Sequence, residues 1–362
     1  MRKKLNVVLF LLCCLLLGGC AGKETAGLPA DTAENTRTIV DMAGRSVTIP
    51  AQVNKVYGAS PTGTILLYTI DPDLLVGWNY FMGMDGSQFV AEKYKNLPVL
   101  GGWFGNISTA NTEDLIRLHP DLILTMDSPK KPELADRIQD LTGIPVVVVD
   151  GSIDKMEEAY RFAGKVLGRE ERTAALADYC RETVALVRER KPQLAGRSPV
   201  RVYYAEGSRG LETEPAGSWH AELIEYVGGV NVAGTGLPPG GELGRSPVSA
   251  EQVLLWNPEV VLIGYFRAGE TSSYAQIMTD GDWADIAAVR HKRVYEIPTQ
   301  PFNWFDRPPC INRLIGIRWV ANLLYPEVFQ LDMRAEVKRF YQLFYHYTLS
   351  DREVDALLQH TQ

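Results

Sequence analysis

The sequence predicts an α/β protein of two similar lobes, each with a mostly parallel sheet flanked by helices, joined by one long helix. Three observations support this fold class. A helix–turn–strand unit occurs twice, strand-like segments alternate with helical patterns in both halves, and a long helical pattern without Gly or Pro separates the halves. A chain of 362 residues is also longer than a typical domain built on one hydrophobic core, so two domains are expected.

The repeated unit comprises residues 112–124 and 250–262. Each copy has a Glu near the start of a helical pattern, a Pro that stops the helix, an acidic residue and then a short apolar strand. We expect Thr112 and Ser249 to cap the two helices, with a Glu in the favourable first turn of each. The matched order of these features favours a duplication over chance similarity.

Short apolar segments bounded by Gly, Pro and polar residues supply the other strands. They are 54–59, 74–78, 98–101 and 145–150 in the first half, and 200–205, 260–265 and 293–297 in the second half. Residues 41–45, between two strand-like runs, predict a hairpin turn near the start. Because the remaining strands alternate with helical patterns, their pairing is expected to be mostly parallel.

The middle of the chain, residues 152–197, is predicted to be a linking helical region. No Gly or Pro occurs between Gly168 and Pro192, and charges fill the face opposite the helical core positions. These core positions are Leu176, Tyr179, Cys180, Thr183, Leu186 and Val187. A stiff helical linker permits small-angle rocking of the lobes and resists a wide hinge. The alternative is a helix packed inside one domain.

The N-terminus has the pattern of an export signal. A basic start at residues 1–4 is followed by an apolar run over 5–17 and by Leu17-Gly18-Gly19-Cys20. The run is shorter than the roughly 20 apolar residues of a membrane-spanning helix. The Leu-Gly-Gly-Cys ending resembles a bacterial lipobox, so we expect lipidation of Cys20 after cleavage. The alternative is an ordinary signal peptide in which Cys20 is incidental.

These features divide the chain into five parts and place its folded part outside the cytoplasm. The parts are a signal peptide at 1–19, a flexible tether at 20–37, an N-terminal lobe at 38–151, the linking helical region at 152–197 and a C-terminal lobe at 198–362. We therefore expect a protein that is lipid-anchored to the cell membrane, on the periplasmic side or the outer face, without crossing it.

Composition and motifs exclude several function classes. The net charge of −7 becomes more negative when Arg2, Lys3 and Lys4 leave with the signal, which argues against nucleic acid as a partner. The sequence lacks a Gly-x-x-x-x-Gly-Lys-Ser/Thr phosphate loop, a His-Glu-x-x-His zinc motif and a Gly-x-Ser-x-Gly motif. The five histidines lie far apart, so no catalytic residue, cofactor or bare-metal site is predicted.

Several of these features together resemble a known family. They are the lipobox-like ending, the paired Glu-containing units, the helical linker and two short motifs. The motifs are Asp41-x-x-Gly44-Arg45-x-Val47-x-Ile49-Pro50 and Trp304-x-Asp306-Arg307-Pro308. Over nearly all of residues 38–345 the chain resembles the helical-backbone (class III) substrate-binding lipoproteins of ABC transporters. This family handles ferric siderophores, haem, cobalamin and, in some members, oxyanions such as molybdate.

The resemblance implies a binding protein rather than an enzyme. It implies a ligand held in the cleft between the lobes and delivered to an ABC permease and its ATPase, and we expect a monomer. It also implies that one surface Glu on each lobe docks onto arginines of the permease; by position in the repeated unit these are Glu113 and Glu251. The alternative for both residues is ordinary charge pairing at a helix N-terminus.

Ligands of open α/β sheets bind beyond the carboxyl ends of the strands. Aromatic and arginine side chains are frequent in the segments there, and they suit a bulky, partly apolar, often anionic complex. The predicted ligand-binding residues are Trp78, Tyr80, Trp103, Phe104, Arg209, Trp219, Arg245, Tyr265, Arg267, Trp304 and Arg307. The alternatives are that Trp78 and Trp103 cap the first sheet, that Arg307 pairs with Asp306, and that the other arginines are solvated.

The predicted cargo is a metal chelate, with the metal present only as part of the bound complex. A ferric siderophore is favoured, with a corrinoid or haem next; for haem, Tyr80, Tyr265 or His220 would supply an axial ligand. A molybdate-like oxyanion requires a small polar nest, which the aromatic residues disfavour. The alternative class is an extracytoplasmic enzyme or chelatase on the same scaffold. The nearby acids for such chemistry are Glu206, Glu242 and Asp306.

Overall fold

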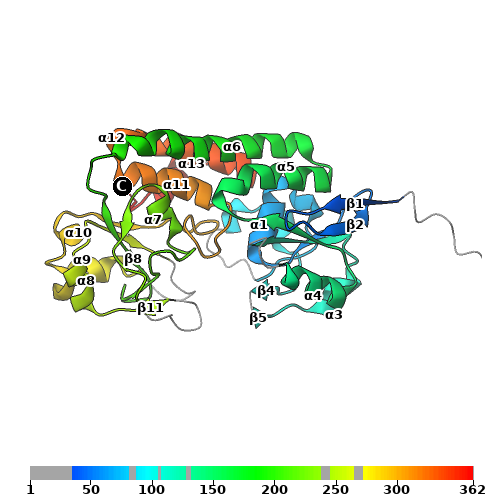
Figure 1. The fold of residues 1–362 in the computed structure, drawn as a ribbon, viewed down its shortest axis with the longest axis horizontal. Coiled ribbons are helices and arrows are strands. Elements are labelled where there is room, and N and C mark those ends of the chain that lie inside the picture. The colour runs from blue at the N-terminus through cyan, green and yellow to red at the C-terminus, as the bar shows by residue number, and fades with distance from the viewer. Residues whose placement is uncertain are drawn as a thin grey trace, which may run out of the picture.

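The computed structural model of the chain describes residues 35–80, 87–104, 107–127, 132–237, 245–264 and 272–361. The predicted signal, Cys20 and most of the tether lie outside these ranges. Two α/β lobes lie side by side beneath one layer of long helices (Figure 1). The predicted fold class is confirmed, because each lobe contains a parallel sheet flanked by helices. None of the helices in the described ranges is long and apolar enough to cross a membrane.

The N-terminal lobe starts with an antiparallel hairpin and contains a parallel sheet of order β3-β6-β7. The predicted hairpin turn is confirmed: the Asp41 carboxylate accepts hydrogen bonds from the backbone N–H groups of Ala43 (3.0 Å) and Arg45 (2.9 Å). The strands are β1 (Thr36–Val40), β2 (Ser46–Pro50), β3 (Val56–Gly58), β4 (Trp103–Phe104), β5 (Ile107–Ser108), β6 (Leu122–Asp127) and β7 (Val146–Asp150). The helices are α1 (Pro61–Ile70), α2 (Glu92–Lys95), α3 (Thr112–Arg117), α4 (Glu133–Thr142) and α5 (Met156–Leu167).

The predicted strands at 74–78 and 98–101 are wrong as continuous elements. Only isolated parallel bridges occur there, one between Val56 and Leu75 and one between Trp78 and Val99. Pro98 has no N–H group to donate to a ladder, and the first segment is preceded by a 3₁₀ turn over Pro72–Leu74.

The C-terminal lobe contains a parallel sheet of order β10-β8-β12-β13. Strand β12 is buried at every position, in agreement with its continuous apolar sequence. The strands are β8 (Arg201–Ala205), β9 (Glu212–Thr213), β10 (Val230–Asn231), β11 (Ser246–Pro247), β12 (Val260–Ile263) and β13 (Val294–Glu296). The helices of this half are α7 (Glu222–Tyr226), α8 (Ala250–Trp256), α9 (Tyr274–Thr279), α10 (Ala287–Arg290), α11 (Arg313–Leu324), α12 (Pro326–Phe329), α13 (Met333–Tyr345) and α14 (Asp351–Leu357).

The two copies of the repeated unit have equivalent structures. Helix α3 leads into β6 and helix α8 leads into β12, each through a residue in the left-handed conformation, His119 (φ 51°) and Asn257 (φ 42°). The Ser249 hydroxyl accepts from the N–H of Gln252 (3.2 Å), as predicted for a cap. The predicted cap Thr112 is wrong, because Asn111, one residue earlier, accepts the equivalent bond.

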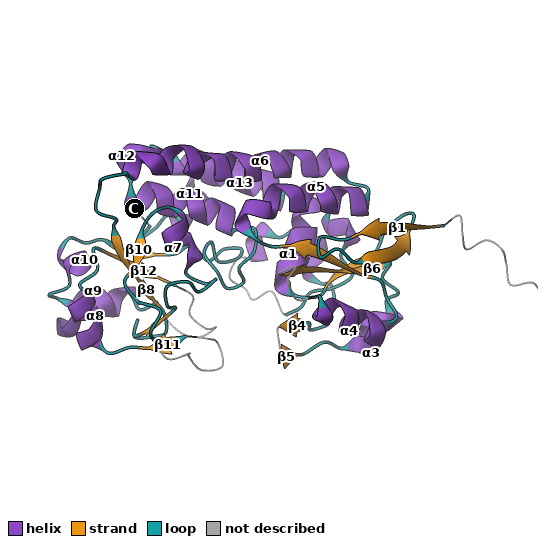
Figure 2. Cartoon of the chain, viewed as in Figure 1, coloured by secondary structure: helices purple, strands orange, loops and turns teal. Residues whose placement is uncertain are grey.

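A layer of long helices joins the two lobes (Figure 2). Helix α6 (Glu170–Arg190) extends over both lobes and packs on α5 of the first lobe and on α11, α12 and α13 of the second. Gly168 ends α5 in the left-handed conformation, and α6 is the long helix predicted between Gly168 and Pro192. Helix α6 is therefore packed against both lobes and not inside one domain.

The buried face of α6 belongs to one continuous hydrophobic core. Its Tyr179 lies in the same cluster of buried residues as Leu66 of α1 and Trp319 of α11. Arg318 of α11 adds polar contacts: its Nε donates to the Thr183 hydroxyl (2.9 Å), and its guanidinium lies 4.6 Å from the Tyr179 ring centroid. Wide separation of the lobes would expose this shared apolar surface to water. Each Å² of apolar surface exposed costs about 25 cal/mol of free energy, so the helical layer favours small-angle motion of the lobes.

We predict that Gly316→Ala destabilises the protein. A Cβ at Gly316 in α11 would lie 1.9 Å from the backbone oxygen of Trp304, so α11 and the segment before it would have to separate. We expect the free energy of unfolding, measured by urea denaturation, to fall by about 1–3 kcal/mol, although Ala favours a helix interior over Gly. The control is Gly281→Ala, where an added Cβ meets nothing within 4 Å. Equal stability of both variants would contradict close packing here.

Candidate functional site

The segments that follow β3 and β13 meet where the two lobes approach each other. A small pocket at this place is lined by Pro61, Thr64, Ile65, Trp78, Asn79, Tyr80 and Phe302. Phe302 comes from the C-terminal lobe, and the other lining residues come from the N-terminal lobe. Since both segments start at the carboxyl ends of parallel strands, this is the position expected for a ligand between the lobes.

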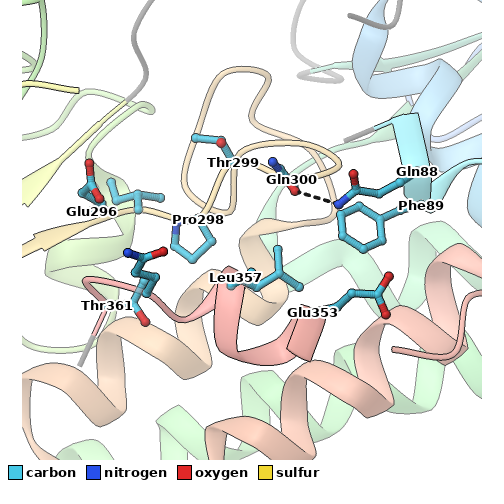
Figure 3. A pocket seen from close by; sticks show the side chains of 12 residues that line it. Gln88, Phe89, Glu296, Pro298, Thr299, Gln300, Glu353, Leu357 and Thr361 are labelled. Carbon is cyan, nitrogen blue, oxygen red and sulfur yellow. Dashed lines mark hydrogen bonds between the residues drawn. The ribbon is translucent and has the colours of Figure 1, made fainter. Parts of the chain in front are cut away.

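A second pocket also lies between the lobes, against the residues that follow β13 (Figure 3). Gln88 and Phe89 line it from the N-terminal lobe, and the side-chain amide of Gln88 donates to Oε1 of Gln300 (3.3 Å). Glu296 lies at its other end and contacts Nδ1 of His360 at 2.7 Å. Nowhere in the described ranges do three or more His, Cys, Asp or Glu side chains converge as a possible metal site.

The carboxyl end of β8 carries a largely buried group of charged side chains, which we call the acid–arginine cluster. It consists of Glu206, Glu212, Glu214, Arg245, Asp306 and Arg307. Nε of Arg307 lies 2.9 Å from Glu206 and 3.3 Å from Asp306, and its Nη2 pairs with Glu214. Arg245 lies 3.2 Å from both Glu206 and Glu212. Both guanidiniums are thus engaged by carboxylates of the same lobe.

Neighbouring groups fix the two most buried acids of the cluster. Glu206 follows β8 directly, and its backbone exchanges hydrogen bonds with Glu212 across a tight turn. Asp306 accepts a hydrogen bond from the Tyr204 hydroxyl (2.7 Å), and its backbone N–H donates to Oδ1 of Asn303 (3.2 Å). Burial, reinforced by the charge of Asp306, raises the pKa of Glu206 to about 7, although the neighbouring Arg307 opposes this shift.

Trp219 and His220 lie beside the cluster at the surface of the C-terminal lobe. Trp219 is 36 % exposed, and the side chain of His220 is 32 % exposed. Nδ1 of His220 lies 2.9 Å from Oδ2 of the fully buried Asp306. The backbone N–H of His220 donates to the Ser218 hydroxyl (3.2 Å), which fixes the turn before α7.

The N-terminal lobe contributes a polar edge at the start of α1. The hydroxyls of Ser60 and Thr62 lie 2.8 Å apart, and Thr62 donates to the backbone oxygen of Met126 (2.9 Å). No acidic residue occurs in the first turn of α1, so its positive helix end is not neutralised locally. Asn79 is buried and donates to the backbone oxygens of Gly58 (2.8 Å) and Gly101 (2.9 Å), which connects the segments around this edge.

The predicted tryptophans have different positions in the structure. Trp304 is fully buried in the shared core, so its ring has no face for a ligand in this structure. Trp78 is 3 % exposed and donates its indole N–H to the backbone oxygen of Tyr94 (2.7 Å), and Trp103 is 7 % exposed. The rings of Trp78 and Trp103 are thus buried in the N-terminal lobe, which agrees with the capping alternative. Trp219 remains exposed.

The other predicted residues are more scattered. Tyr80 is 39 % exposed beside the small pocket, and Arg209 is exposed in the turn after β8. Arg245 and Arg307 lie in the acid–arginine cluster, and Arg307 contacts Asp306 as the alternative stated. Phe104 is described only as part of β4. The predicted residues Tyr265 and Arg267, and the acid Glu242, lie outside the described ranges.

Glu113 and Glu251 occupy equivalent exposed positions in the first turns of α3 and α8. The two helices belong to different lobes and lie on the side of the molecule away from the helical layer (Figure 1). Ser249 donates a hydrogen bond that lowers the pKa of Glu251, so this carboxylate is charged at neutral pH. Both residues are accessible to a partner from that side.

We predict that Glu206 makes stability depend on pH. Its native pKa of about 7 exceeds the ordinary value of about 4.3. Between these two pH values the native state binds more protons than the unfolded state, so stability falls as pH rises from about 4 to 7. Glu206→Gln should remove about 1–3 kcal/mol of this fall, measured by urea denaturation at several pH values. The control is Glu212→Gln, in the same cluster but with its side chain 47 % exposed. Identical pH slopes for wild type and Glu206→Gln would contradict the prediction.

Comparisons with known proteins agree with this fold. The family described as "Periplasmic binding protein" matches residues 70–301. The molybdate-binding protein MolA of Haemophilus influenzae is 25 % identical over 337 residues, covering 85 % of this chain and 91 % of that protein. The vitamin B12-binding protein of Vibrio cholerae is 25 % identical over 213 residues, covering 56 % of this chain and 68 % of that protein.

A solved structure extends the likeness to the whole fold. The ABC transporter solute binding protein from Sulfurospirillum deleyianum is 31 % identical with a TM-score of 0.81, covering 89 % of this chain and 99 % of that one. These homologues are extracytoplasmic transport proteins, not enzymes, which removes the alternative of an enzyme or chelatase. The chain therefore belongs to the periplasmic binding protein family, as a solute-binding protein of the class III type that serves an ABC importer.

Proposed function

We propose that this protein captures a metal chelate of neutral or positive charge between its lobes and delivers it to an ABC permease. A ferric siderophore remains the favoured cargo, with a corrinoid or haem next. The observation that carries this proposal is the charge balance of the acid–arginine cluster. Among the described residues of this cluster, four acidic side chains surround two guanidiniums, so the cluster carries a net negative charge even when Glu206 is protonated.

Because acidic side chains outnumber guanidiniums in this cluster, we no longer expect its arginines to attract an anionic complex. Arg245 and Arg307 are buried or nearly so, with side chains 5 % and 13 % exposed, and each contacts carboxylates of its own lobe. Removing a guanidinium from a buried ion pair leaves an uncompensated charge, which costs several kcal/mol. A neutral complex, such as Fe³⁺ bound by three singly charged hydroxamates, avoids this cost.

The exposed aromatic side chains support an organic shell around the metal. Tyr80 and Trp219 come from opposite lobes and are each more than one-third exposed. Aromatic rings of this kind combine a large apolar area with a polar group and are suited to partly apolar ligands. The inward position of Trp78 and Trp304 leaves this role to fewer rings than the sequence predicted.

A molybdate-like oxyanion is a second candidate. The relative matched over 91 % of its length is named a molybdate-binding protein. The start of α1, with the hydroxyls of Ser60 and Thr62 and no acid in its first turn, is a helix end of the kind that binds anions. The four carboxylates of the acid–arginine cluster argue against this candidate.

We further infer that Cys20 carries the lipid anchor and that Glu113 and Glu251 dock onto the permease. The equivalent placement of the two acids on the two lobes supports a partner that presents matched basic groups to both. The lipid would hold the protein close to that partner through the tether.

We predict that protein purified from its native membrane contains its bound cargo. Native mass spectrometry should show a bound mass equal to an intact metal chelate, and the purified chelate should quench tryptophan fluorescence without turnover. Trp219→Ala should weaken its binding by about 1–3 kcal/mol, measured by isothermal titration. The control is Leu255→Ala, which removes an exposed apolar side chain of α8. Tight binding of molybdate, with no chelate bound, would favour the second candidate.

We predict that Glu113→Ala combined with Glu251→Ala leaves ligand affinity nearly unchanged and impairs uptake by cells. The physical reason is the loss of one charge pair with the permease on each lobe. The matched control is Glu133→Ala, an exposed acid in the first turn of α4. A large loss of ligand affinity in the double variant would show that these acids line the ligand site and would contradict the docking role.

A further inference from the structure

The two helices that carry the proposed docking acids also expose large aliphatic side chains. Ile116 of α3 is 40 % exposed, and Leu254 and Leu255 of α8 are 42 % and 79 % exposed. Leu255 is the most exposed large hydrophobic residue in the described part of the chain. The core-facing side of each helix is a different one, because Leu115 and Val253 are fully buried in the cores of their lobes.

Each acid shares one helix face with these aliphatic residues, because side chains three and four positions apart in a helix are neighbours. The α3 face consists of Glu113 and Ile116, and the α8 face consists of Glu251, Leu254 and Leu255. Both helices lie on the side of the molecule away from the helical layer (Figure 1). A partner that reaches both acids from that side therefore also meets the aliphatic residues.

The two faces differ at one equivalent position of the repeated unit. Leu255 of α8 corresponds to Arg117 of α3, and Gln252 corresponds to Asp114. Nη1 of Arg117 lies 2.6 Å from Asp114, so the α3 face is bordered by an ion pair where α8 has a leucine and an amide. Leu255 lies outside the cluster of buried side chains of its lobe. The shared scaffold therefore does not require an aliphatic residue at this position.

We propose that the α8 face is an apolar anchor for the ABC permease, in which Leu254 and Leu255 pack on apolar side chains beside the charge pair of Glu251. This inference rests on the proposed docking role and makes the two lobes unequal, since the α3 face contributes mainly charge. An apolar centre with a charged rim is typical of protein interfaces. A two-fold contact between copies of this chain would instead bring two Glu251 carboxylates close together, which like charges oppose.

The test measures binding of the purified protein to its permease–ATPase complex in lipid nanodiscs by surface plasmon resonance. Leu254→Ser combined with Leu255→Ser should weaken binding about 10–100-fold. The loss should be similar at low and high salt, because salt screens charges and not apolar burial. Leu255→Met keeps the apolar area and should retain the affinity. The matched control is Val40→Ser, which removes an exposed aliphatic side chain in β1, beside the helical layer (Figure 1).

The acid variants separate this inference from the proposed docking role. Glu113→Ala combined with Glu251→Ala should weaken binding mainly at low salt, where charge pairs are least screened. Unchanged affinity of the double serine variant, with weakened binding of the acid variant, would overturn the inference and leave the docking role intact. The reverse result would remove the docking role of the acids and keep the apolar anchor. A dimer in light scattering that the serine variant abolishes would assign the α8 face to a second copy and also overturn the inference.

Discussion

The hydrophobic core shared by the two lobes is the constraint on which the rest of the structure depends. Helix α6 packs on α5 at one end and on α11 and α13 at the other, and its Tyr179 lies in the same cluster as residues of both sheets. The lobes are therefore held by one apolar layer and not by a free linker. Because close-packed cores resist shear, the distance between the ligand-facing edges is set mainly by this layer.

The two lobes share an architecture but differ in chemistry. Their duplicated units have the same order of elements, and each unit contains one residue in the left-handed conformation, His119 or Asn257. The acid–arginine cluster, in contrast, lies in the C-terminal lobe, whereas the N-terminal edge offers hydroxyls and the start of α1. Since the scaffold is common and the charges are not, recognition of the cargo is expected to depend mainly on the second lobe.

Local sequence patterns predicted the fold well, because turns, caps and strand periods are set by neighbouring residues. The hairpin at 41–45, the repeated unit and the long helical pattern were all visible in this way. The site was predicted less well, since Arg307 reaches Glu206 and Glu214, which are 101 and 93 residues away. Spacing after a strand likewise does not tell whether Trp304 points inward or outward. Glu214 was missed because no local pattern marks a buried acid.

One short segment after β13 contributes to the interlobe contact, the small pocket, the core and the acid–arginine cluster. Gln300 bonds to Gln88 of the other lobe, Phe302 lines the interlobe pocket, and Trp304 fills the core. Asp306 and Arg307, a few residues further along the chain, belong to the acid–arginine cluster. Substitutions here alter mechanical coupling and selectivity together, whereas the Trp219 side chain is 36 % exposed and lies outside the shared core. Divergence toward a new cargo is therefore easier through the Trp219 side chain than through the segment after β13.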